Sequence, residues 1–270
     1  MKKYIFLLFA VVSIIIGCSS KTSNEQTLTQ EDDSLKRVKN AGKLVLGLDD
    51  TFAPMGFRDS NGEIVGFDID LATEAARRIG VDLETVSIEW PNSTSILTNG
   101  EVDVIWNGLN IIEARKKDMI FSKPYLNNKL VIVKSIDDET INSLEDLVEK
   151  NVGVQSGGNY EQISNNTAIS KITNMSKYND NIKLFEDLQS GILDAAIIDD
   201  VFAQYYIAEK NSPFVILENI PLTNGLYVVG FRKSDTELLN EVNRILDEMK
   251  SDGTAAKISV KWFGKDIVLK

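Results

Sequence analysis

Polar side chains able to bind ions or small polar groups follow several apolar runs of this sequence. Acidic pairs stand at 49–50 and 199–200, and segments rich in amides and glycine stand at 107–110 and 155–159. In open α/β sheets, ligands bind beyond the carboxyl ends of the strands. Each patch alone is an ordinary loop, but together they predict a polar crevice to which both halves of the chain contribute.

The composition excludes several kinds of chemistry. The 270 residues contain no histidine and one cysteine. A Ser-His-Asp or Cys-His relay, a histidine-built zinc site, an intrachain disulfide and an iron–sulfur cluster are therefore ruled out. A formal net charge of −11 argues against nucleic-acid binding, which needs cationic side chains to displace counterions. We accordingly predict no catalytic residue, no metal ion, no cofactor and no nucleic-acid partner.

Residues 1–17 have the pattern of a secretory signal peptide. A short basic start precedes an apolar run over residues 4–16. This run is too short for a membrane span, which needs about 20 residues, but it fits the apolar core of a signal peptide, about 7–15 residues. The run ends in Ile15-Ile16-Gly17-Cys18, which resembles the lipobox of bacterial lipoproteins. A plain signal peptide with an incidental cysteine is the alternative.

The lipobox resemblance implies that Cys18 carries lipid and becomes the first residue of the mature chain. Residues 18–33 are rich in Ser, Thr, Asn, Gln and acids, and Leu28 is the apolar residue that follows Cys18 in them. Such a composition cannot build a core and is typical of a flexible tether. We expect an exported protein on the outer face of the bacterial cell membrane, in contact with the membrane only through its lipid anchor.

Strand-like and helix-like segments alternate after the tether. Short aliphatic runs predict buried strands at 43–48, 102–106, 152–154, 195–198 and 226–231. Asp68 is expected to cap a helix that ends at Gly80, and the apolar positions between 238 and 249 predict another helix, stopped by Gly253. Asn61-Gly62 is a hairpin turn signal. This alternation indicates α/β layers around parallel sheets.

Several longer motifs occur in an order and spacing that together are specific. They are DDTFAPMGF at 49–57, GFDIDL at 66–71, LTNGEVD at 97–103, NG at 107–108 with Arg115, FSKPY at 121–125, VGVQSG at 152–157, GILDA at 191–195 with Asp199, and KWFG at 261–264. On these motifs the chain, from about Lys43 to Gly264, resembles the polar amino acid substrate-binding proteins of bacterial ABC transporters, solute-binding protein family 3.

The resemblance implies a two-lobed periplasmic-binding-protein fold of type II. Two α/β lobes are joined by a hinge that the chain crosses twice, and the ligand cleft lies between them. Lobe 1 is expected at 34–133 plus 228–270 and lobe 2 at 134–227, with crossings near Val133-Lys134 and within 227–230. The implied function is binding of a free polar amino acid by hinge closure and delivery to an ABC transporter permease. The protein is expected to be a monomer and not an enzyme.

A site for a free amino acid must supply a cation and an anion, because burying either charge of the ligand unpaired costs several kcal/mol. Arg115 matches the family's arginine, and its planar fork suits the ligand carboxylate. The resemblance places Asn107, Gly108 and Asn110 around the same carboxylate, although the family usually has Ser or Thr where Asn110 stands.

Asp199 is expected to hold the ligand's ammonium group, with its neighbour Asp200 as the alternative by one position. The loop of lobe 2 is expected to close over the ligand. Its predicted contacts are Gln155, Gly157, Gly158 and Asn159.

Phe52 and Trp90 align with the two aromatic residues that sandwich the ligand side chain in this family, and Trp106 is expected to be packing. Asp49 stands where the family contacts the end of that side chain. Because a carboxylate between aromatic faces favours a cation or an amide, we predict glutamine or a basic amino acid as ligand.

Two other functions stay open. Some relatives resemble periplasmic dehydratases of cyclic precursors, and Asp49 or Glu89 would have to serve as acid or base in such an enzyme. The second alternative is a ligand-sensing module that acts through a partner.

Overall fold

The computed structural model describes residues 32–210, 212–217, 220 and 222–270. The predicted signal peptide over 1–17, the lipidated Cys18 and the predicted tether up to residue 31 lie outside these residues. Among the helices of the part described, none is long and apolar enough to cross a membrane.

The first large sheet has the strand order β5-β1-β6-β14-β7, with β8 paired to β14. Its strands are β1 (Lys43–Leu48), β5 (Asp82–Ser87), β6 (Val104–Asn110), β7 (Met119–Phe121), β8 (Leu126–Asn128) and β14 (Gly225–Arg232). β1 pairs in parallel with β5 and β6, but β14 runs antiparallel to β6, β7 and β8. The prediction of parallel sheets is therefore wrong for the β14 side, because an apolar run does not encode the direction of its strand.

The second large sheet has the order β11-β10-β12-β9-β13. Its strands are β9 (Leu130–Ser135), β10 (Asn151–Gln155), β11 (Asn174–Tyr178), β12 (Ala195–Asp199) and β13 (Phe214–Ile216). β10 is parallel to β11 and β12, while β9 is antiparallel to β12 and β13. The aliphatic runs at 43–48, 152–154 and 195–198 are thus confirmed as strands with buried interiors.

A small third sheet joins β2 (Thr51–Phe52), β3 (Gly56–Arg58) and β4 (Ile64–Val65) in antiparallel pairs. The turn between β3 and β4 is the predicted one. Gly62 N donates to Asp59 O at 3.0 Å, and the φ of Gly62 is 83°. This positive φ explains why glycine follows Asn61 in the turn.

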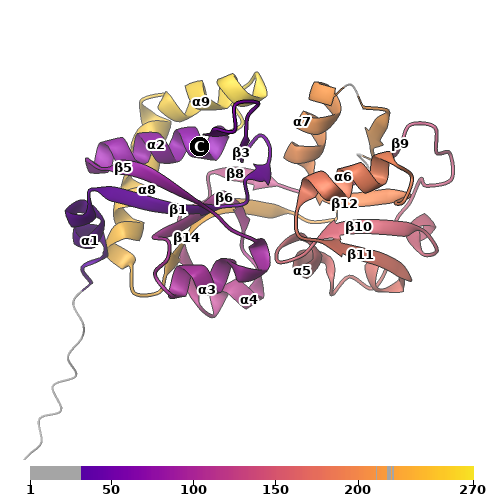
Figure 1. The fold of residues 1–270 in the computed structure, drawn as a ribbon, viewed down its shortest axis with the longest axis horizontal. Coiled ribbons are helices and arrows are strands. Elements are labelled where there is room, and N and C mark those ends of the chain that lie inside the picture. The colour runs from indigo at the N-terminus through magenta and orange to yellow at the C-terminus, as the bar shows by residue number, and fades with distance from the viewer. Residues whose placement is uncertain (1–31, 211, 218–219, 221) are drawn as a thin grey trace, which may run out of the picture. The chain divides into compact units, whose positions relative to one another are not determined.

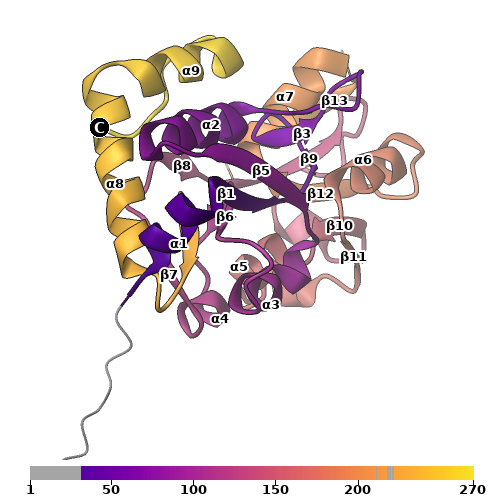
Figure 2. The ribbon, with the colours of Figure 1, turned by 60° about the vertical axis from the view of Figure 1, so that its left-hand side comes forward.

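Helices cover both large sheets, as Figure 1 shows. Around the first sheet lie α1 (Ser34–Ala41), α2 (Phe67–Ile79), α3 (Ser93–Thr98), α4 (Glu113–Lys116), α8 (Thr236–Ser251) and α9 (Thr254–Phe263), and around the second lie α5 (Asn159–Ile163), α6 (Asn181–Gln189) and α7 (Asp200–Lys210). Short 3-10 segments occur at η1 (Trp90–Asn92), η2 (Glu145–Leu147) and η3 (Ile169–Lys171). The turned view of Figure 2 shows α8 and α9 beside α2, which both contact.

The apolar periodicity predicted α2 and α8, and it was the N-terminal cap of α2 that differed from the expected one. The expected stripe of α8 is buried, from Leu238 to Met249, and Gly80 ends α2 in the left-handed region as predicted. The expected cap of α2 by Asp68 is wrong. Gly66 occupies the cap position, and Asp68 is instead a fully buried side chain of the first turn.

The chain passes from the first sheet to the second at Lys129, between β8 and β9, and returns between β13 and β14. Sequence analysis placed the first passage near Val133-Lys134, but both residues pair with β12 inside the second sheet. Residues 227–230, the expected second passage, already belong to β14 of the first sheet. Both passages therefore come earlier in the chain than expected, and the exact bounds of the two lobes stay a prediction.

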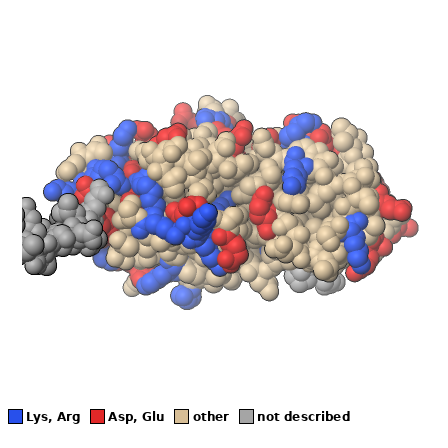
Figure 3. Space-filling view, turned by 90° about the horizontal axis from the view of Figure 1, so that it is seen from below, with Lys and Arg blue, Asp and Glu red and all other residues tan. Residues whose placement is uncertain are grey.

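Charged side chains of both signs are intermixed on the face shown in Figure 3. The acidic excess of the sequence is thus accompanied by neighbouring lysines and arginines on this face. Such an arrangement is typical of a solvated surface and not of a surface that attracts one sign of charge.

Candidate functional site

Residues of both large sheets and of segments beside them line one small cavity. Its lining residues are Phe52, Trp90, Gly108, Asn110, Arg115, Gln155, Gly158, Asn159 and Asp199. Every one of them was predicted from the sequence as a binding residue. Of the predicted set, Asp49, Asn107 and Gly157 do not line the cavity. Its volume is about 10 Å³, which is close to the space that one water molecule needs, so an amino acid can enter only if the lining residues separate.

Strand ends and helix starts present most of these residues. Gln155 ends β10, Asn159 begins α5, and Asp199 ends β12 directly before α7. The ends of the parallel strands β10 and β12 meet at one edge of the second sheet, which brings these side chains together. Residues 107–110 were expected after a strand but lie inside β6, which continues to Asn110.

Gly108 is held in place by a buried carboxylate. Its N–H donates to Asp68 Oδ2 at 2.6 Å, and the same oxygen accepts from Tyr125 Oη at 2.8 Å. The φ of Gly108 is 59°, and a Cβ there would lie 2.6 Å from the ring of Phe52. Glycine is therefore required by both the backbone and the space. Burial raises the pKa of Asp68 to about 7, against the hydrogen bonds that lower it.

Arg115 is a buried cation on α4, with 3% of its surface exposed. Nη1 donates to Asn110 O at 2.8 Å, and Nη2 donates to Gly157 O at 2.6 Å. In the part of the chain described, no carboxylate lies within 4.0 Å of the guanidinium, and Glu161 acts on it only from farther away. Burial lowers the pKa of Arg115 to about 10, so it stays protonated at neutral pH. Within the described ranges, this side chain is therefore a buried charge without a close counter-ion.

Asp199 is the matching buried anion, with 2% of its surface exposed. Oδ1 accepts from Asn128 Nδ2 at 2.6 Å and from Tyr227 Oη at 2.8 Å, and Oδ2 accepts from Asn159 Nδ2 at 2.6 Å. No lysine or arginine among residues 32–210 and the later described ones comes within 4.0 Å of it. Burial raises the pKa of this carboxyl, and the three donors oppose the rise.

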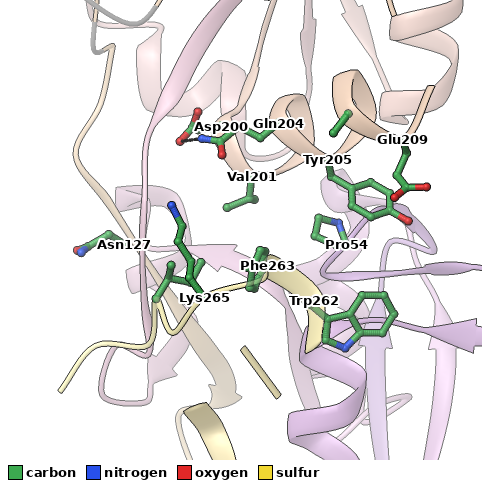
Figure 4. A pocket seen from close by; sticks show the side chains of 12 residues that line it. Pro54, Asn127, Asp200, Val201, Gln204, Tyr205, Glu209, Trp262, Phe263 and Lys265 are labelled. Carbon is green, nitrogen blue, oxygen red and sulfur yellow. Dashed lines mark hydrogen bonds between the residues drawn. The ribbon is translucent and has the colours of Figure 1, made fainter. Parts of the chain in front are cut away.

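The neighbour of Asp199 faces a different part of the molecule. Asp200 Oδ2 accepts from Gln204 Nε2 at 2.9 Å and lies 3.6 Å from Lys129 Nζ. Asp200 also lines a separate, larger cavity of about 390 Å³ between α7 and the C-terminal segment, which Figure 4 shows. None of the predicted binding residues lines that cavity. Of the two acids left open by the sequence, Asp199 is thus the one at the small cavity.

The Asp49 carboxylate faces protein groups rather than the cavity. Oδ1 accepts from Thr51 N and Thr51 Oγ1 at 2.9 and 2.6 Å, and Oδ2 accepts from Trp90 Nε1 at 3.1 Å and from Gln155 Nε2 at 2.8 Å. These four donors use the acceptor capacity of the carboxylate. Asp49 therefore links Trp90 of the first lobe to Gln155 of the second. Burial raises its pKa, and the hydrogen bonds from Thr51 and Gln155 lower it.

The two aromatic residues that line the cavity, Phe52 and Trp90, have different neighbours. Trp90 is buried in η1, directly before Pro91, and the Arg115 guanidinium carbon lies 5.0 Å from the centroid of its ring. Phe52 packs edge-on against Tyr227, with ring centroids 6.4 Å apart. Trp106, expected to be packing, is fully buried in β6.

The two remaining predicted residues lie behind the lining. Asn107 Oδ1 accepts from Asp49 N at 3.2 Å, and its buried Nδ2 has no hydrogen-bond partner among the described residues. Gly157 has a φ of 80°, and a Cβ there would lie 2.4 Å from Pro91 N. Gly157 therefore permits the close approach of the second lobe to Trp90 and Pro91.

Sequence reasoning missed Asn128, Tyr227 and the site role of Asp68. Asp68 stands inside the GFDIDL motif, where its position favours a helix cap, and Tyr227 falls within the expected second hinge passage. Asn128 carried no sequence signal at all. Their hydrogen bonds join residues 28 to 71 positions apart, which local patterns cannot reveal.

Comparison with known proteins supports the resemblance. Residues 44–265 match the model of the bacterial extracellular solute-binding proteins, family 3. The L-cystine-binding protein TcyJ of Escherichia coli (strain K12) is 30% identical over 257 residues, which are 95% of this chain and 93% of that protein. The arginine-binding extracellular protein ArtP of Bacillus subtilis (strain 168) is 28% identical over 266 residues, 97% of this chain and 98% of that protein.

Solved structures agree in fold. A substrate-binding protein of an ABC uptake transporter from Streptococcus pneumoniae, with bound histidine, gives a TM-score of 0.84 at 31% identity over 90% of this chain and 100% of that chain. An ancestral amino acid-binding protein, a precursor of cyclohexadienyl dehydratase, gives a TM-score of 0.77 at 34% identity over 85% of this chain and 99% of that chain. The expected two-lobed α/β fold is thereby confirmed.

Proposed function

Because the chain belongs to the bacterial extracellular solute-binding proteins of family 3, we propose that it binds a free α-amino acid outside the cytoplasm and delivers it to the permease of an ABC transporter. One observation carries this proposal. The cavity has a buried cation, Arg115, and a buried anion, Asp199, and each lacks a close counter-ion among the described residues. A zwitterionic ligand supplies both missing partners at once.

The ligand carboxylate binds the guanidinium of Arg115, whose fork matches two carboxylate oxygens. The ligand ammonium binds Asp199, which already accepts hydrogen bonds from Asn128, Tyr227 and Asn159. Gly108 lines the same cavity, and its N–H donates to Asp68, which fixes its backbone. In this arrangement the other predicted residues bind or enclose the ligand without reacting with it.

Hinge closure encloses the ligand. The bonds from Gln155 to Asp49 and from Arg115 to Gly157 O join groups of the two lobes, so they break when the lobes separate. Ligand entry needs this separation because the cavity is too small in the present geometry. The closed, ligand-bound form is the one that a permease distinguishes from the open form.

The ligand side chain is proposed to be that of glutamine or a basic amino acid. Asp49 lies directly behind Trp90 and Gln155, and no cation among the described residues is within 4.0 Å of it. Its negative charge and the aromatic face of Trp90 favour a cationic or amide group and repel an acidic one. The relative named for arginine and the solved structure with bound histidine accord with this choice, whereas the cystine-binding relative keeps cystine as the competing ligand.

A thermal-shift screen of residues 19–270 against the common amino acids and L-cystine tests the binding. A ligand at a hundred times its Kd is expected to stabilise the protein by about 2.7 kcal/mol, which raises its melting temperature by several degrees. Glutamine, arginine or lysine is expected to give the largest rise. Tight binding of glutamate alone, or of cystine alone, contradicts the proposed side-chain class, and the absence of any shift contradicts amino-acid binding itself.

The protein is proposed to have no catalytic activity. Asp49 is fully engaged by Thr51, Trp90 and Gln155 and does not line the cavity, so it is poorly placed as an acid or base. Incubation with prephenate or arogenate is therefore expected to leave both substrates unchanged. Turnover that disappears in Asp49→Asn or Glu89→Gln variants is the contrary outcome, and it favours a dehydratase-like enzyme.

The proposed location and partners rest on the sequence. Cys18 is proposed to carry the lipid that holds the monomeric protein near its permease. The expected tether over 18–33 is proposed to end at residue 31, because Asp32 accepts hydrogen bonds from Thr236 and Glu237 of α8. A Cys18→Ala variant is the means to test the anchor, since it releases the protein from the membrane if lipid is the attachment.

A further inference from the structure

Two side chains of the first sheet reach across to the Asp199 carboxylate. Asn128 Nδ2 lies 2.6 Å and Tyr227 Oη lies 2.8 Å from Oδ1. Both side chains are buried, and neither lines the cavity. The other oxygen, Oδ2, accepts from Asn159, which belongs to α5 beside the second sheet. The carboxylate is therefore held by both lobes, one oxygen each.

The two donors to Oδ1, and Asp199 itself, lie where the chain passes between the sheets. Asn128 is the last residue of β8, directly before the passage at Lys129, and Tyr227 lies near the start of β14, directly after the return. β8 and β14 pair with each other, with Leu126 opposite Tyr227. Asp199 itself is opposite Leu130, the first residue of β9. Atoms beside a hinge move least when the lobes rotate, so these contacts are suited to persist in the open form.

Resting on the proposed function, we propose that Asn128 and Tyr227 are positioning residues that keep Asp199 ionised and aimed at the ligand ammonium from the hinge side. Donors to a carboxylate favour its charged form, whereas burial favours the neutral form, which cannot pair with an ammonium group. Two donors on Oδ1 and one on Oδ2 leave the remaining lone pair of Oδ2 for the ligand.

The surroundings of Asp199 make these donors important. The titratable groups that face it are Tyr227 itself and, across the cavity, Arg115. Asp200 follows it in the chain and is turned toward Lys129. Asp68 lies behind Tyr227 and acts on that phenol. With no cation within 4.0 Å among the described residues, the hydrogen bonds from Asn128, Tyr227 and Asn159 are what oppose protonation of the buried carboxyl.

The test measures ligand affinity against pH by calorimetry, from pH 5 to 9, for wild type, Tyr227→Phe and Asn128→Leu. The probe is L-arginine, with L-glutamine and then L-lysine in its place if it does not bind. Each variant is expected to bind about tenfold more weakly at pH 7. The pH at which affinity has fallen by half is expected to rise by about one unit, since one pKa unit corresponds to a tenfold change.

Tyr178→Phe is the matched control. Tyr178 Oη also donates to a carboxylate, Asp187 Oδ2, at 2.8 Å, but this pair lies on β11 and α6, and neither residue lines the cavity. This variant is expected to keep the wild-type affinity and pH profile. Asn128→Ser, which keeps a polar group at the buried position, replaces Asn128→Leu if the latter does not fold.

The outcomes separate this inference from the proposed function. If wild type binds none of the three amino acids, the proposed function is wrong in its ligand class. If wild type binds and the folded Tyr227 and Asn128 variants keep its affinity and its pH midpoint, the positioning role is wrong and the proposed function stands. A loss of affinity with an unmoved pH midpoint also overturns the role, because it indicates a merely structural effect.

Discussion

Replacing Arg115 by methionine is expected to weaken amino-acid binding by ~140-fold to ~4,000-fold. The ligand carboxylate would be buried beside a side chain that offers it no charge and no hydrogen bond. Removing one partner of a buried charge pair costs about 3–5 kcal/mol. Each 1.4 kcal/mol is a factor of ten in Kd, which gives the stated range. Calorimetry with the ligand found in the screen measures the effect directly.

Arg115→Lys separates charge from geometry at the same position. Lysine keeps the positive charge but loses the planar fork, so its affinity is expected between those of wild type and Arg115→Met. Arg244→Met is the control, because Arg244 is exposed on α8 and pairs with Glu241 far from the cavity. Equal affinity of folded Arg115→Met and wild type would show that the ligand carboxylate binds elsewhere.

The sequence predicted the cavity better than it predicted the sheets. Motif order brought Arg115, Asp199 and Gln155 together although they come from distant segments, and the structure places all three around one cavity. The direction of β14 was not predictable, because an apolar run reports burial and not polarity of pairing. The expected first hinge passage was misplaced for the same reason. Val133 and Lys134 belong to a buried strand, and their sequence does not show to which sheet that strand belongs.

The side chains that support the site were beyond the sequence for another reason. An aspartate near the start of a helix commonly caps it, so Asp68 was assigned to that role. In the fold Gly66 takes the cap position, and Asp68 is free to accept the N–H of Gly108, 40 residues away. Asp49 likewise satisfies Gln155, 106 residues away, instead of facing the cavity. Hydrogen-bond partners so far apart in the sequence come together only when the chain has folded, so local sequence patterns do not reveal them.

This contrast bears on how the site discriminates among ligands. In the proposed function, the ends common to all amino acids bind Arg115 and Asp199, whose types and positions the sequence predicted. The end that differs among amino acids is proposed to lie near Asp49, which accepts hydrogen bonds from Trp90 and Gln155 in this structure. We therefore expect specificity to depend on which ligand side chain can replace or extend the Asp49–Gln155 hydrogen bond. A sequence motif does not encode that replacement.

Asp199→Asn is expected to weaken binding by a similar factor and to remove its pH dependence. Burial raises the pKa of the Asp199 carboxyl above its ordinary value of 3.8. As the pH falls through this raised pKa, the carboxyl takes a proton and loses its attraction for the ligand ammonium, so wild-type affinity falls with decreasing pH. An asparagine carries no titratable charge, and its affinity is expected to be low and flat over the same range.

The free energy of unfolding depends on the protonation of Asp199 in the opposite direction to ligand affinity. A raised pKa in the folded state means that the stability contributed by Asp199 is greatest at acid pH and is lost as the pH rises through that pKa. The ligand ammonium offsets the cost of the ionised form, so the rise in melting temperature on adding ligand is expected to grow with pH. The pKa values of Asp49 and Asp68 are raised as well, but their contributions are common to liganded and free protein unless they contact the ligand.

Asp200→Asn is the control at the adjacent position, and it is expected to keep both the affinity and its pH dependence because Asp200 faces Gln204 and Lys129. If Asp200→Asn loses binding while Asp199→Asn retains it, the ammonium site is at Asp200.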